Sequence, residues 1–195
     1  MCRNILETGT RLEETALVRA AQLPDPDTVE PGKPARMTTR FGIKGGRVVG
    51  DAKRRGKPRT LRFTVTFLRE LTNYKDLRRK EALAAFRLRH PGEPSPPELF
   101  LSERTGEPIT PAALYKSWHE YASLPFKGFS PHIGRHTFAC LTVMRLIKDE
   151  MALIERSIHL VPEAIIFQHA TSLIDIYIRP VLGHVSQRTT ERYLD

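Results

Sequence analysis

Hydrophobic and polar positions alternate in one short part of the chain, PRTLRFTV. There Leu61, Phe63 and Val65 are separated by polar side chains, which is the period of two expected of a strand with one buried face. Two further extended segments come earlier, ARMTTRF at 35–41 and GRVVGDAK at 46–53, and the turn sequences KGG and RRGK separate the three. The pattern therefore predicts three antiparallel strands joined by basic turns.

Helical patterns fill most of the remaining sequence. Thr10 and Glu13 have the spacing of a capping box, which would make Arg11 the first residue of a short helix. Two later helices are predicted to begin at a hydroxyl N-cap followed by proline, as in Thr110-Pro111 and Ser130-Pro131. The other segments with helical patterns are 67–90 and 147–180, the latter broken near Val161-Pro162.

A single domain accounts for a chain of this length. The 195 residues, 40% of them hydrophobic, suit one core, and no internal repeat is found. The proline-rich segment 90–111 is interpreted as a connection within that domain, and Trp118 and Tyr121 as core residues. The predicted fold class is mainly α with a small three-stranded antiparallel sheet (α+β).

The charge of the chain favours an anionic partner. Lys and Arg total 31 against 22 Asp and Glu, a formal net charge of +9, and nucleic acid is the first candidate. A solvated loop is the alternative interpretation of a basic run. Asp51 is the one acidic residue between positions 36 and 62. The basic residues of this segment, which holds the predicted sheet, are Arg36, Arg40, Lys44, Arg47, Lys53, Arg54, Arg55, Lys57, Arg59 and Arg62.

Cysteine content and hydropathy predict a soluble intracellular protein. Cys2 and Cys140 are too few for a disulfide framework, and a reducing compartment is the natural expectation. The first residues lack the apolar core of a signal peptide, and the long apolar stretch 164–178 is interrupted by polar side chains.

A small set of residues has the chemistry to act on a phosphodiester. Arg11 and Glu14 form an i, i+3 pair, and His132 and Arg135 share one face of the first turn after Ser130. Two guanidiniums can hold both non-bridging oxygens of a phosphate through charge-assisted hydrogen bonds. A tyrosine hydroxyl can attack the phosphorus when a base accepts its proton, and a lysine can protonate the departing sugar oxygen. Tyr193 is the candidate nucleophile.

Three motifs occur in a fixed order: TGTRLEETALV, PHIGRHTFA and LGHVSQRTTERYL. They resemble the T-G-x-R-x-x-E segment, the H-x-x-R-H-T box and the L-G-H-x-S…T-x-x-Y ending of the tyrosine recombinases, the phage integrase family. His184 precedes Tyr193 by nine positions, as the resemblance requires. From Thr8 to Tyr193 the chain is thus similar to the catalytic domain of that family, and the resemblance implies its DNA breaking-rejoining fold.

The resemblance implies a catalytic set with Glu14 as support for the first arginine. The hairpin KRRGKPRT is similar to the family's K-x-G-K-x-R-T but has one extra residue, so Lys53 is the predicted acid and Lys44 and Lys57 are alternatives. A 3′-phosphotyrosyl link would preserve the energy of the broken bond, so neither a cofactor nor a metal is implied. The implied catalytic residues are Arg11, Lys53, His132, Arg135, His184 and Tyr193.

The implied function is site-specific DNA recombination or integration, as in mobile elements. The implied partners are double-stranded DNA and other recombinase protomers, which form a tetramer on DNA in the family. The implied location is the cytoplasm, at the nucleoid of a prokaryote. The basic residues predicted to contact the DNA backbone are Arg47, Arg54, Arg55, Lys57 and Arg59.

The sequence also departs from the family pattern. From His132 to His184 there are 184 − 132 = 52 positions, longer than is usual in the family, so 147–180 is predicted to hold a helical insertion. Residues 1–195 are expected to be a catalytic domain without its first helix, its N-terminal DNA-clamping domain and its C-terminal tail.

Other functions remain open at this point. The alternatives are a type IB topoisomerase-like enzyme, a telomere resolvase and a catalytically inactive DNA-binding remnant. The target sequence, and the choice between integration, excision, resolution and transposition, are also open.

Overall fold

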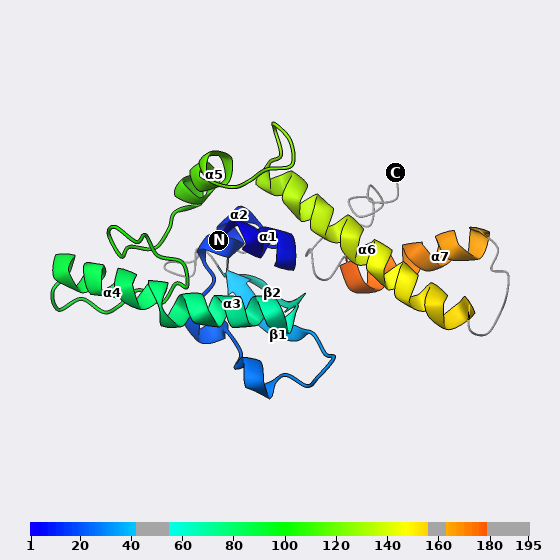
Figure 1. Ribbon diagram of the computed structural model, residues 1–195, viewed down its shortest axis with the longest axis horizontal. Coiled ribbons are helices and arrows are strands. Elements are labelled where there is room, and N and C mark those ends of the chain that lie inside the picture. The colour runs from blue at the N-terminus through cyan, green and yellow to red at the C-terminus, as the bar shows by residue number, and fades with distance from the viewer. Residues whose placement is uncertain (42–54, 156–162, 179–195) are drawn as a thin grey trace.

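The structure, a computed structural model, describes residues 1–41, 55–155 and 163–178 (Figure 1). Helices dominate them, and one small sheet lies near the middle of the chain's fold. The elements are α1 (Cys2–Thr8), α2 (Leu12–Ala16), η1 (Ala20–Gln22), η2 (Pro26–Thr28), β1 (Ala35–Phe41), β2 (Arg55–Phe63), α3 (Val65–Asp76), α4 (Arg78–Arg89), α5 (Pro111–Glu120), α6 (Pro131–Glu155), α7 (Glu163–Leu173) and the π-helical turn η4 (Ile174–Ile178). The predicted fold class, mainly α with a small antiparallel sheet, is confirmed.

The sheet contains two strands within the described residues, not the three predicted. β1 and β2 pair antiparallel, with Thr39 opposite Arg59 and an irregularity in the register between Thr39 and Phe41. The predicted middle strand, 46–53, lies outside the described residues. Val65 was expected to end the last strand but begins α3 instead, because the hydroxyl of Thr64 caps that helix by accepting a 3.2 Å hydrogen bond from the Phe67 N–H.

The main core lies between the sheet and α3. The inward-facing residues of both strands pack against α3, which runs beside the sheet in Figure 1. Burial of this face follows from the alternation that predicted the strands. The core residues are Val18, Ala35, Met37, Leu61, Phe63, Phe67, Leu68, Leu71, Leu99 and Phe100.

A second cluster fixes α1 against α5 and the start of α6. Trp118 is buried and its indole N–H donates a 2.5 Å hydrogen bond to the carbonyl oxygen of Phe129, while Ile5 packs beside them. The prediction that Trp118 is a core residue is confirmed. The same prediction for Tyr121 is wrong, because α5 ends at Glu120 and the Tyr121 side chain is 80% exposed.

The two proline-marked helix starts are confirmed. Thr110 accepts a 3.1 Å hydrogen bond from the Ala113 N–H, and Ser130 accepts a 3.3 Å one from the Ile133 N–H. α6 packs its first turns on α1, and its second half extends away from the sheet with α7 beside it (Figure 1).

The helical pattern predicted for 147–180 holds on both sides of its predicted break. α6 continues to Glu155 and α7 begins at Glu163, and the break itself lies outside the described residues. Buried residues of α6 and η4 pack together through Ala139, Val143 and Ile174. None of the described helices has the length and apolarity to cross a membrane.

Candidate functional site

The corner between α1 and α2 sets the position of Arg11. Gly9 ends α1 in the left-handed conformation, with φ 62°. Arg11 is the N-cap of α2, and its backbone N–H donates a 2.7 Å hydrogen bond to Oε2 of Glu14. The predicted capping box of Thr10 and Glu13 is therefore wrong by one residue. The Thr10 hydroxyl is buried instead, where it meets the Thr15 hydroxyl at 2.8 Å.

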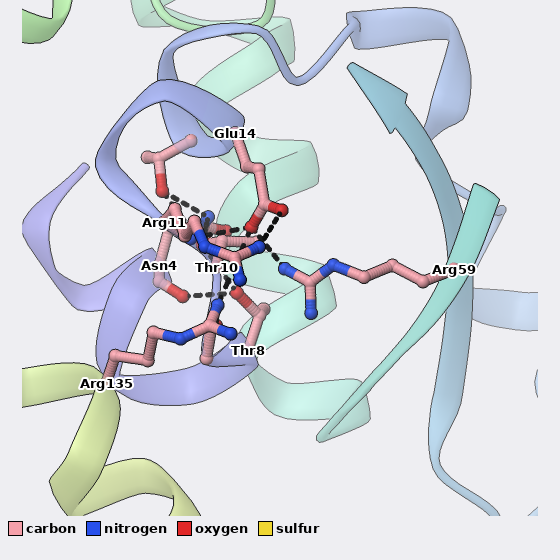
Figure 2. A network of polar contacts seen from close by, with 9 residues as sticks. Asn4, Thr8, Thr10, Arg11, Glu14, Arg59 and Arg135 are labelled. Atoms are coloured by element: carbon pink, nitrogen blue, oxygen red, sulfur yellow. Dashed lines mark hydrogen bonds and ion pairs between the residues drawn. The ribbon is translucent and has the colours of Figure 1, made fainter. Parts of the chain in front are cut away.

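Three guanidiniums surround the carboxylate of Glu14, which is fully buried (Figure 2). Arg11 Nη1 lies 3.1 Å from Oε1, Arg59 Nη2 is bonded to Oε2, and Arg135 Nη1 lies 3.8 Å from Oε2. They come from the N-cap of α2, from β2 and from α6, so segments far apart in sequence meet at one carboxylate. We call Glu14 and these three arginines the Glu14 cluster. With one anion for three cations, the cluster has a net positive charge and is suited to take up a further anion.

The three arginines differ in burial. The Arg11 side chain is 29% exposed, whereas those of Arg59 and Arg135 are 5% and 4% exposed. Arg135 Nη1 also donates a 2.5 Å hydrogen bond to the carbonyl oxygen of Gly9. Arg11 is therefore the member of the cluster that reaches solvent most readily.

Arg59 is the least satisfied of the three. Burial lowers the pKa of its guanidinium, and the neighbouring charge of Arg11 lowers it further, against the opposing effect of Glu14. Its Nε and Nη1 atoms are buried and have no hydrogen-bond partner among the described residues. The hydroxyl of Thr39, opposite Arg59 in the register, is likewise buried and unpartnered within that part of the chain.

Two imidazoles meet on the first turns of α6. His132 is exposed, and its Nε2 lies 2.8 Å from Nε2 of His136, so one ring donates a hydrogen bond to the other. Burial lowers the pKa of His136, and the charges of His132 and Arg135 lower it further. His136 was not among the predicted site residues, although its i, i+4 spacing from His132 placed both on one face of the helix.

The structure brings together part of the predicted site. Arg11, Glu14 and Arg135 meet in one cluster, and His132 lies on the same helical turn as Arg135. Arg59, predicted to contact the DNA backbone, is buried against Glu14 instead of lying on the exposed surface. Of the other predicted residues, Arg55 and Lys57 have their backbone in β2, while Lys44, Arg47, Lys53, Arg54, His184 and Tyr193 lie outside the described residues.

The described residues offer no ready site for a metal ion. Within 1–41, 55–155 and 163–178, no group of three His, Cys, Asp or Glu side chains lies close enough together to hold one.

Comparison with solved structures shows a shared fold. The XerA recombinase is 20% identical, with a TM-score of 0.55 over 97% of this chain and 50% of that chain. The Tn1549 transposon integrase in complex with transposon right end DNA is 16% identical, with a TM-score of 0.51 over 100% of this chain and 53% of that chain. The chain thus spans about half the length of the structures it resembles. Neither a model of a known protein family nor a curated protein matches it.

Proposed function

We propose that the chain is the catalytic part of a site-specific DNA recombinase of the tyrosine type. The observation that carries the proposal is the convergence of Arg11, the N-cap of α2, and Arg135 of α6 on the single carboxylate of Glu14. Paired guanidiniums are suited to hold the two non-bridging oxygens of one phosphodiester, where negative charge develops during attack. The fold shared with a recombinase and a transposon integrase also supports it.

In the proposed reaction, the phenol oxygen of Tyr193 forms a bond to the phosphorus and the bond to the 5′ oxygen breaks. The phenolic proton passes to a base assisted by His132, and the departing 5′ oxygen takes a proton from Lys53. His184 donates a hydrogen bond to the phosphate. A second 5′ hydroxyl reverses the step, so strands are exchanged without a cofactor.

The proposed partners are double-stranded DNA and further protomers of the same protein, acting in the cytoplasm. DNA as the partner is supported by the net charge of +9 and by the DNA bound to the Tn1549 integrase in its solved complex. Basic side chains near the sheet would meet the phosphate backbone, which positions DNA without reading its sequence.

Trapping of a covalent adduct tests the proposal. The chain is incubated with a library of nicked duplexes of random sequence, in which a cleaved fragment diffuses away and leaves the enzyme attached. We expect a denaturing gel to show a slow-migrating protein–DNA adduct that is lost in Tyr193→Phe. Tyr121→Phe is the matched control, because the exposed Tyr121 ring lies outside the proposed site and the adduct should persist.

The same assay separates the alternatives. Salt-sensitive DNA binding with no adduct would contradict cleavage and favour a DNA-binding remnant. Relaxation of supercoiled plasmid regardless of sequence would favour a type IB topoisomerase-like activity.

A further inference from the structure

We infer that Arg59 is a positioning residue, which keeps the Arg135 guanidinium available for the scissile phosphate by occupying the buried carboxylate of Glu14. The inference rests on the proposed function and adds to it a residue outside the implied catalytic set. Its basis is the geometry around one oxygen atom, Oε2 of Glu14.

Oε2 has two close donors and one distant cation. The Arg11 backbone N–H lies 2.7 Å away and Arg59 Nη2 is bonded directly, while Arg135 Nη1 stays at 3.8 Å. Arg135 instead directs that same nitrogen to the Gly9 carbonyl oxygen at 2.5 Å. Because Glu14 is fully buried, its negative charge must be compensated by neighbouring groups and not by water.

Removal of Arg59 would leave Oε2 of Glu14 with an unused acceptor position. The buried negative charge of Glu14 would then have one compensating cation fewer. The guanidinium of Arg135 already lies 3.8 Å from Oε2 and needs only a small movement to reach ordinary hydrogen-bond distance. That movement would draw Arg135 toward Glu14 and away from a bound phosphate. Arg59 prevents it from the side of the sheet, where its Nη2 stays bonded to Oε2 of Glu14 (Figure 2).

The burial of Arg59 without full hydrogen bonding indicates a role beyond stability. Its Nε and Nη1 are buried and unpartnered among the described residues, so the side chain retains a cost that an apolar residue beside Leu61 would avoid. A buried polar group that is incompletely satisfied calls for an explanation, and a role in a functional site is one that fits the position of Arg59 beside Glu14.

Four variants test the inference: Arg59→Met, Arg59→Lys, Glu14→Gln and the double variant R59M/E14Q. Arg59→Met should slow adduct formation at saturating DNA by about 100-fold, the size expected when a reacting group is misplaced by about 1 Å. The Kd for DNA should change far less, because most contacts to the DNA backbone lie elsewhere. Arg59→Lys keeps the charge and should lose less than Arg59→Met, since the bond to Glu14 uses one nitrogen of Arg59.

Rescue by charge removal is the decisive result. If Arg59 acts by occupying Glu14, then R59M/E14Q removes the attraction that displaces Arg135 and should form adduct at least about 10-fold faster than Arg59→Met, a coupling of the size seen between contacting residues. A purely structural role predicts the opposite, with the double variant slower than either single one. Lys116→Met, which removes an exposed cation from α5, outside the Glu14 cluster and the sheet, should leave the rate unchanged.

A crystal structure of Arg59→Met gives a readout independent of cleavage. The distance from Arg135 Nη1 to Glu14 Oε2 should fall below the 3.8 Å of the wild type, and an unchanged distance would overturn the inference. If Arg59→Met does not fold, the same distance is measured in Arg59→Lys, where it should stay near 3.8 Å. If the wild type forms no adduct, the proposed function fails, and the distance alone still decides whether Arg59 positions Arg135.

Discussion

Arg135 Nη1 donates a 2.5 Å hydrogen bond to the carbonyl oxygen of Gly9, joining the first turns of α6 to the corner between α1 and α2 across 126 positions of sequence. Gly9 is in the left-handed conformation with φ 62°, and this conformation fixes where its carbonyl oxygen meets Arg135. The backbone conformation of one glycine thereby helps to place a guanidinium of the proposed clamp.

Gly9→Ala is expected to cost about 1–2 kcal/mol of unfolding free energy, because a side chain in the left-handed region meets its own backbone. It should also slow adduct formation, since relief of the strain rotates the carbonyl that holds Arg135. Urea denaturation and the nicked-duplex assay measure the two effects. Gly32→Ala is the control: its φ of 77° gives similar strain in an open turn, and the rate should not change.

Arg11→Lys and Arg135→Lys should both slow adduct formation by about 10²–10³-fold, the usual effect of losing one preorganised donor at a developing charge. They should differ in stability. Arg135 is buried and bonded to Gly9, so its replacement should cost about 1–3 kcal/mol. Arg11 is 29% exposed, and its replacement should cost less than about 1 kcal/mol. Equal losses in urea denaturation would contradict this interpretation of the cluster.

Local signals predicted the helix starts, whereas the interior of the site needed tertiary information. The proline-marked caps at Thr110 and Ser130 depend on neighbouring residues only, and both are confirmed. Thr10 had equally good capping chemistry, but its hydroxyl is taken up in a buried contact with Thr15 that no local pattern reveals.

The burial of Arg59 was partly readable from the sequence. The basic run around it suggested an exposed surface, yet the period of two puts Arg59 on the same face as Leu61 and Phe63. The alternation was the better guide, because in a strand the face decides burial and the side-chain type does not. The sequence could not reveal the ion-pair partner of Arg59, since Glu14 lies 45 positions away from it along the chain.

Gly134→Ala is expected to destabilise the protein although alanine is the better helix former by about 1 kcal/mol. A Cβ at position 134 would lie 2.8 Å from Cη2 of Trp118 and 3.1 Å from Cδ2 of Leu6. The Trp118 indole cannot easily move aside, because its N–H is bonded to the Phe129 carbonyl oxygen and its ring is stacked on the Phe129 ring. Overpacking of this kind costs about 1–3 kcal/mol. Thermal denaturation measures this loss of stability. In a Trp118→Phe background the smaller ring leaves space for the added Cβ, so Gly134→Ala should cost less stability there.

His136 should make stability depend on pH. Burial lowers its folded-state pKa below the ordinary 6.5, so the unfolded chain binds the proton more tightly. The stability contribution of the neutral ring is therefore complete above about pH 6.5 and is lost as the pH falls through the lower folded-state pKa. Urea denaturation between pH 7 and pH 5 should show a smaller decline in His136→Asn than in the wild type. His119→Asn, at an exposed position of α5, should retain the wild-type decline.

Glu14→Gln should be among the most damaging single substitutions in the chain. It leaves three guanidiniums facing one another with no anion among them, and loss of one partner from a buried ion pair costs about 3–5 kcal/mol. Glu13→Gln changes the neighbouring residue in the same helix, but Glu13 is exposed and its loss should cost less than about 0.5 kcal/mol. Urea denaturation of the two variants compares their losses of unfolding free energy directly.

Anion binding separates this electrostatic explanation of Glu14 from simple loss of packing. If the arginines of the Glu14 cluster are left with excess positive charge, inorganic sulfate should bind Glu14→Gln more tightly than the wild type and raise its melting temperature more. Sodium chloride at equal ionic strength is the control for screening. A similar sulfate effect on both proteins would mean that the carboxylate does not set the charge of the cluster, and the case for a phosphate clamp built around it would be lost.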